Sequence, residues 1–227
     1  MSVSADMPAA DGAVQGSEAA FRYGAVFLLV LAVVVFAIVA PDGSGSRAIS
    51  FALVGVAMMI SVATSREPTD VRRTRTLIGG AAVLIIIIAT AASLIPRSIT
   101  LAATGLLTLA IPVTLAGGLI RLVRTRGATM QAVAGGLAIY LLIGLGFASA
   151  IGFVATVESG QYFAQGAGSN VSEHVYYSFT VLTTTGFGDL TAANSMGRAL
   201  AVLEMLVGQL YLVTVISILI GRRLAKR

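Results

Sequence analysis

The sequence contains no cysteine, no tryptophan and a single histidine, His174. The missing cysteines exclude disulfides, thiolate catalysis and cysteine-ligated metal sites, and one histidine leaves too few ligands for a histidine-built metal site. Charged residues are also scarce, at 11% of the chain, against about a quarter in an ordinary soluble protein. No G-x-S-x-G nucleophile motif occurs. We therefore expect neither an enzyme nor a resident cofactor.

Apolar residues take the place of the missing charge. Hydrophobic residues make up 57% of the chain, and the mean hydropathy is +0.93. This balance predicts an all-helical, multi-pass protein of the cell membrane. The net charge is +5, but the basic residues stand beside apolar runs and form no soluble patch. We therefore expect no nucleic-acid partner.

The apolar segments set the expected organisation of the chain. Residues 1–20 are small, polar and slightly acidic, which predicts a disordered cytoplasmic tail rather than a secretory signal. Residues 21–128 form a four-helix membrane region of unknown role, 129–221 form a second region with two more helices, and 222–227 form a short basic cytoplasmic tail. The six expected membrane helices cover 21–40, 49–64, 76–95, 99–120, 130–157 and 195–221.

A shorter helix is expected between the fifth and sixth membrane helices. Residues 172–183 would form a helix about 18 Å long, against a hydrocarbon core of about 30 Å. The segment cannot cross the membrane, so we expect it to re-enter, with Ser172 as its N-cap. Irregular backbone at that depth is tolerated only inside protein or beside a water-filled cavity.

Residues 183–189, which we call the signature segment, read Thr-Thr-Thr-Gly-Phe-Gly-Asp. Glycine at alternate positions frees the backbone, so that successive carbonyl groups can turn to one side of the chain. The segment resembles the potassium-channel signature T-T-x-G-[YF]-G-D, in which Thr185 occupies the free position. In that family, rings of such carbonyl oxygens replace the hydration shell of K⁺.

The resemblance covers roughly residues 129–221 and implies a homotetramer that conducts K⁺ passively. The selectivity filter that it implies consists of Thr184, Thr185, Gly186, Phe187 and Gly188. The first four of these residues offer their backbone carbonyls as K⁺ ligands. The implied supporting residues are Thr183, Asp189, Tyr176 and Tyr177. We expect the Phe187 ring to brace against both tyrosines, and Asp189 to raise the cation concentration at the outer mouth.

The expected sixth helix carries a stripe at steps of three and four, which by resemblance faces a water-filled cavity. The pore and gating candidates on this helix are Glu204, Met205, Gly208, Gln209, Leu212, Ile216 and Ile220. Gly208 lies at the family's hinge glycine, where it either bends the helix or only packs closely. Glu204 is an acid within a membrane helix, which is costly and functional by default. We expect it to lie against the short helix, bonded to Thr180 or Thr183.

The basic residues predict the orientation. If the N-terminus is cytoplasmic, twelve of the fifteen Lys and Arg residues fall on the cytoplasmic side, together with both termini. Arginines 121, 124 and 126 follow the fourth apolar span rather than lying within it, so we expect an anchor and only weak voltage dependence. The residues expected to meet anionic lipid are Arg121, Arg124, Arg126, Arg222 and Arg223.

Other functions fit parts of this pattern. A weakly selective cation channel or a regulatory subunit would share the same architecture. A membrane carrier or an intramembrane enzyme is the rival from another class. Paired half-repeats, which are typical of carriers, are not visible in the sequence.

Overall fold

The computed structural model describes residues 9–64, 80–81, 83–127, 129–158, 161–166 and 170–224. Its named helices are α1 (Ala9–Val39), α2 (Ser44–Thr64), α4 (Arg97–Arg126), α5 (Met130–Val157), α6 (Val171–Leu182) and α7 (Ser195–Leu224). A further helical stretch covers 83–91, before α4. Within these ranges the only extended pairing is an isolated bridge between Phe163 and Ala192. The described chain is therefore all-helical, as predicted.

Among the described residues, three helices are long and apolar enough to cross a membrane: Arg97–Arg124, Met130–Val157 and Ser195–Val215. Two shorter apolar stretches cover Tyr23–Val39 and Ser44–Ile60. The expected third helix, 76–95, falls partly outside the described residues, so the count of six crossings stays a prediction. At 12 residues, α6 is too short to span a membrane.

Two helix ends differ from the expected organisation. The first helix begins at Ala9, so the expected disordered tail is wrong for residues 9–20, while residues 1–8 lie outside the described residues. Five alanines within 9–20 explain the difference, because alanine has the highest helix propensity. At the other end, α7 continues to Leu224, into the expected basic tail, because Arg and Leu also favour helix.

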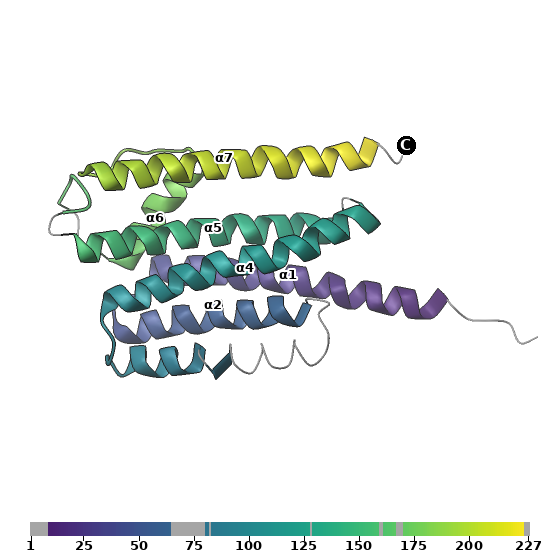
Figure 1. The fold of residues 1–227 in the computed structure, drawn as a ribbon, viewed down its shortest axis with the longest axis horizontal. Helices are drawn as coiled ribbons and strands as arrows, with labels where there is room; N and C mark the ends of the chain where they lie inside the picture. The colour runs from purple at the N-terminus through teal and green to yellow at the C-terminus, as the bar shows by residue number, and fades with distance from the viewer. Residues whose placement is uncertain are drawn as a thin grey trace, which may run out of the picture.

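The helix α5 lies at the centre of the bundle (Figure 1). Helices α1 and α4 pack along one side of it, α2 packs on these two, and α7 lies on the opposite side. The largest core includes Val30 of α1, Ile111 of α4 and Leu142 of α5. The short helix α6 packs between α5 and α7, at one end of the bundle, and also contacts α1. This packing fixes the position of the signature segment.

The fourth and fifth helices are joined by a very short turn. Gly127 ends α4 with a left-handed φ of 78°, and the Thr129 side chain caps α5 by accepting from the Ala132 N–H at 3.3 Å. So short a link makes α4 and α5 of one chain antiparallel neighbours. The four-helix region therefore packs against the fifth helix of its own chain.

Candidate functional site

The short helix α6 delivers the signature segment, and its N-terminus is capped by Asn170. The Asn170 side chain accepts from the Glu173 N–H at 2.8 Å. Ser172, the expected cap, instead donates its hydroxyl to the carbonyl of Ile38 in α1, at 2.9 Å. The expectation for Ser172 is therefore wrong. An Asn three residues before an acidic residue satisfies the free N–H groups of the first turn equally well.

The backbone of the signature segment alternates in handedness. Thr184, Gly186 and Gly188 have φ values of 57°, 53° and 80°, all in the left-handed region. A β-branched residue such as Thr184 rarely adopts this conformation, and such strain concentrates at functional sites. Alternation of right-handed and left-handed residues turns successive carbonyls to one side of the chain and successive N–H groups to the other.

The hydrogen bonds of the segment follow this division. The N–H groups of Thr185 and Gly186 both donate to the carbonyl of Thr180 in α6, at 2.9 and 3.1 Å. In the described part of the chain, no donor reaches the carbonyl oxygens of residues 184–187. Residues 183–189 are all exposed in the single chain. The segment thus presents a row of unsatisfied carbonyl oxygens on an open surface.

An aromatic stack supports the segment from behind. The rings of Tyr176 and Phe187 lie parallel, with centroids 6.3 Å apart, and the Tyr176 hydroxyl donates to Asp189 at 2.8 Å. Tyr177 does not join this stack, so the expected brace is wrong for that residue. It is buried and packs edge-on against Tyr162 and Phe163. Successive residues of a helix point about 100° apart, so the two tyrosines serve different neighbours.

Threonine hydroxyls make hydrogen bonds at the start of the signature segment, where it follows α6. Thr183 Oγ1 donates to the carbonyl of Phe179 at 2.6 Å and lies 2.8 Å from Thr185 Oγ1. One residue earlier in the chain, the carbonyl of Leu182 accepts from the Tyr140 hydroxyl of α5 at 3.0 Å. The last turn of α6 is thereby satisfied by side chains from its own end and from α5.

Gly208 of α7 packs against the carbonyl group of Leu182. A Cβ at this position would lie 2.8 Å from both the oxygen and a methyl carbon of Leu182. The helix α7 is unbroken from Ser195 to Leu224. Of the two roles considered for Gly208, the structure therefore supports close packing rather than a bend.

Glu204 is fully buried against α6, at 0% exposure. Its Oε1 lies 2.5 Å from the hydroxyl of Ser178, which also lies 2.8 Å from the carbonyl oxygen of Gly144. The expected location was right, but the expected partners were wrong. Thr180 donates to the Tyr177 carbonyl within α6, and Thr183 bonds to Phe179. One hydroxyl therefore connects α5, α6 and α7.

The remaining inner-helix candidates divide by exposure. Met205 and Gln209 are exposed in the single chain, and Leu212 is half-buried. The side chains of Ile216, Ile220, Arg222 and Arg223 lie outside the described residues, as do those of Arg121 and Arg126. Arg124 is exposed and borders an apolar groove of about 960 Å³ between α4, α5 and α7.

The contacts of Tyr140, Ser178 and the α1–α2 turn were missed at the level of sequence. A signal existed for the first two, since a tyrosine or serine inside an apolar helix needs a hydrogen-bond partner. For Asp42 of the α1–α2 turn, the sequence carried no signal of its partner. Its Oδ1 accepts from the Val171 N–H at 3.3 Å, 129 residues further along the chain.

Comparison with known proteins bears on one part of the chain. A family model described as ion channel matches residues 134–223, which run from α5 through α6 and the signature segment into α7. The comparisons with curated proteins and with solved structures found no match.

Proposed function

Because a family model described as ion channel matches residues 134–223, we propose that this membrane protein conducts K⁺ passively through a pore lined by its signature segments. The observation that carries the proposal is the left-handed φ at Thr184, Gly186 and Gly188. This alternation gives a free row of oxygens from 184–187. Oxygens of this kind replace the water around a dehydrated K⁺ ion.

The proposed pore needs four chains. One signature segment cannot enclose an ion, and free carbonyls are too costly to leave facing lipid. The face of α7 beside the segment is also apolar and exposed in the single chain. Its exposed large residues include Val202, Leu203, Leu206, Leu210 and Val213. A cyclic tetramer would cover this face and close the carbonyls into rings.

The proposed topology has six crossings and a re-entrant α6, with both termini in the cytoplasm. The 12 residues of α6 support re-entry, because they cannot span the hydrocarbon core. Most Arg and Lys residues fall on the side of the membrane that holds the N-terminus, which supports placing that side in the cytoplasm. In this topology the signature segment opens toward the outer face of the cell membrane.

The experiment that tests the function is cation flux into liposomes containing the purified full-length protein. We expect K⁺ uptake along its gradient and little or no Na⁺ uptake. A weakly selective pore would carry both ions at similar rates. A carrier would saturate and require a coupled ion, and a regulatory subunit would carry neither ion alone. Each of these results contradicts the proposal.

Assembly is tested separately, by native mass measurement in nanodiscs. Each chain has a mass of 23.2 kDa, and we expect the conducting species to contain four copies. A conducting monomer or dimer would contradict the proposal, because neither can close the ring of oxygens.

A further inference from the structure

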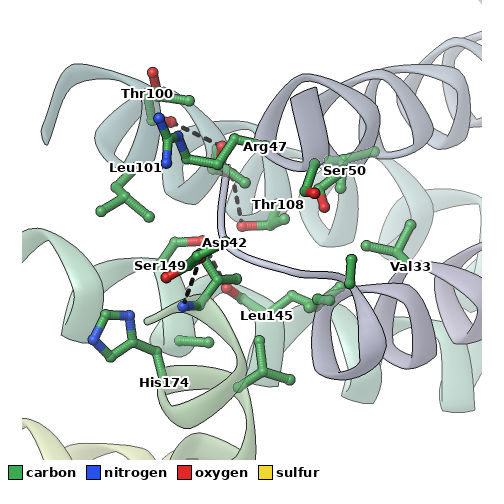
Figure 2. Close-up of a pocket in the computed structure, with 18 of the residues that line it drawn as sticks. Val33, Asp42, Arg47, Ser50, Thr100, Leu101, Thr108, Leu145, Ser149 and His174 are labelled. Carbon is green, nitrogen blue, oxygen red and sulfur yellow. Dashed lines mark hydrogen bonds between the residues drawn. The ribbon is translucent and has the colours of Figure 1, made fainter. Parts of the chain in front are cut away.

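A cavity with several polar side chains in its lining lies where the four-helix region meets α6. It has a volume of about 60 Å³ and is bordered by α1, α2, α4, α5, α6 and the α1–α2 turn (Figure 2). Its polar lining residues include Asp42, Arg47, Thr100, Thr108, Ser149 and His174. A single water needs about 10–15 Å³ of such volume and two to four polar partners. The cavity is therefore roomy and polar enough to hold several waters.

The only histidine of the chain borders this cavity. His174 lies in the first turn of α6 and is 1% exposed. Its ring lies 6.1 Å from that of Phe163, and a Cβ on Gly152 of α5 would come within 2.8 Å of Nδ1. The imidazole is therefore tightly enclosed by α5 and the preceding loop. Waters held in the cavity would give it a route to a proton.

The charges around His174 oppose an imidazolium. Arg47 of α2 and Arg97 of α4 are positive, and the N-terminus of α6 adds a partial positive charge. Asp42 of the α1–α2 turn and Glu173 of α6 are negative. The packed segments α5 (130–157), 23–39 of α1 and 161–166 contain no charged residue.

Together, burial and the neighbouring charges lower the pKa of His174. Burial, followed by the charge of Arg97, lowers the pKa of His174 to about 4, while Asp42 acts to raise it. The ordinary value is about 6.5. Because the folded-state value is the lower one, the stability that neutral His174 contributes is complete above about pH 6.5 and is lost as the pH falls toward 4.

The same corner anchors α6 to the four-helix region. Asp42 accepts from the Val171 N–H at 3.3 Å and pairs with Arg97 at 3.8 Å. Ser172 adds its bond to the Ile38 carbonyl of α1. A charged His174 would compete for Asp42 and repel the helix N-terminus. The other end of α6 holds the signature segment through the Thr180 carbonyl.

We propose that this cavity is a proton-binding site, in which His174 takes up a proton from the membrane face that carries Asp42 and thereby releases the α6 anchor and stops conduction. The effect on conduction rests on the proposed function. The binding of the proton and the release of the anchor do not.

The first test uses the full-length wild-type protein labelled with ¹⁵N-histidine in nanodiscs. Because there is a single histidine, its imidazole signals belong to His174 without further assignment. We expect a titration midpoint near 4, with amide exchange at Val171, whose N–H is bonded to Asp42, rising over the same range. An imidazole that does not titrate while the protein stays folded, or exchange at Val171 that ignores pH, would overturn the proposal. This arm needs no ion flux.

The second test measures K⁺ flux while one face of the liposome is acidified. Below its midpoint, neutral His174 decreases tenfold per pH unit, and we expect the flux to fall with it, only for acid on the Asp42 face. His174→Gln should remove this loss. The control Glu173→Gln, one residue away, removes a negative charge but keeps the imidazole, so the loss of flux should persist, at a pH no higher than in the wild type. Asp42→Asn should move both the midpoint and the flux loss to lower pH, because Asp42 favours the charged form.

The outcomes separate the two proposals. An equal acid response in wild type and His174→Gln would overturn the proton site. If the wild type carries no K⁺ at any pH, the proposed function fails, and the histidine titration with amide exchange still decides the proton site. If His174→Gln does not assemble, the wild-type titration and the Asp42→Asn shift decide it.

Discussion

Gly186→Ala is expected to abolish K⁺ flux or to remove its preference over Na⁺. The residue has a φ of 53°, and nothing lies within 4 Å of the position a Cβ would occupy. The obstacle is therefore the backbone conformation rather than a clash. A left-handed conformation costs an alanine roughly 1–2 kcal/mol, and a tetramer would incur this cost four times. Relaxing φ would relieve it by turning a carbonyl away from the ion.

The measurement is the ratio of K⁺ to Na⁺ uptake in liposomes at equal protein density. Gly117→Ala is the matched control, since a Cβ there also meets nothing within 4 Å and its φ is not left-handed. This control should conduct as the wild type does. An unchanged K⁺ preference in Gly186→Ala would show that the signature segment does not select ions.

The elements that follow from local chemistry were predictable from the sequence. The bounds of α5, Met130–Val157, agree with the prediction because a glycine and a threonine cap precede an uncharged apolar run. The short helix was located within one residue, since the signature segment cannot continue a helix. The alternating glycines predicted a special backbone, and the structure has left-handed φ values at both.

Features that depend on the rotation of one helix against another were not predictable in this way. Glu204 was expected at Thr180 or Thr183, but the rotation of α7 brings it to Ser178, less than two turns away. Tyr176 and Tyr177 are adjacent and alike in sequence, yet only one reaches Phe187. The contact between Asp42 and Val171 has no local signal, because it joins segments 129 residues apart.

The helix α6 is held in place by α1, the α1–α2 turn, α5 and α7. Its N-terminus is held by α1 and the α1–α2 turn, its middle by α5 and α7 through Ser178, and its C-terminus by Tyr140 and Gly208. Each of these contacts is short and specific. The position of the signature segment is thus set by residues from both regions of the chain.

Substitutions at the Ser178–Glu204 contact are expected to have the second-largest effect, on both the free energy of unfolding and the K⁺ flux. A serine hydroxyl carries one proton, and Ser178 has two acceptors within 2.8 Å. The Gly144 carbonyl can only accept. With an ionised Glu204 the single Ser178 proton is shared between two acceptors, whereas a Glu204 carboxyl that carries a proton can donate to Ser178 while Ser178 donates in full to Gly144. A neutral acid is also the form that a membrane interior favours.

This arrangement predicts an order among substitutions. Ser178→Ala and Glu204→Leu each remove one partner of a buried hydrogen bond, which costs roughly 1–3 kcal/mol of unfolding free energy per chain. Glu204→Gln should cost less than Glu204→Leu, because a carboxamide N–H can donate to Ser178 where the acid did. Met205→Leu, at an exposed neighbouring position, is the matched control for stability and should change the free energy of unfolding little.

A double-mutant cycle measures the pair directly. The free energy of unfolding in detergent is determined for Ser178→Ala, Glu204→Leu and the double variant, alongside the K⁺ flux of each. Because both single changes break the same bond, we expect the double variant to lose less stability than the sum of the two. We also expect the flux to decrease with the single changes, since α6 loses its link to α7. Strict additivity of the unfolding free energies, with flux unchanged throughout, would show that Glu204 only fills space.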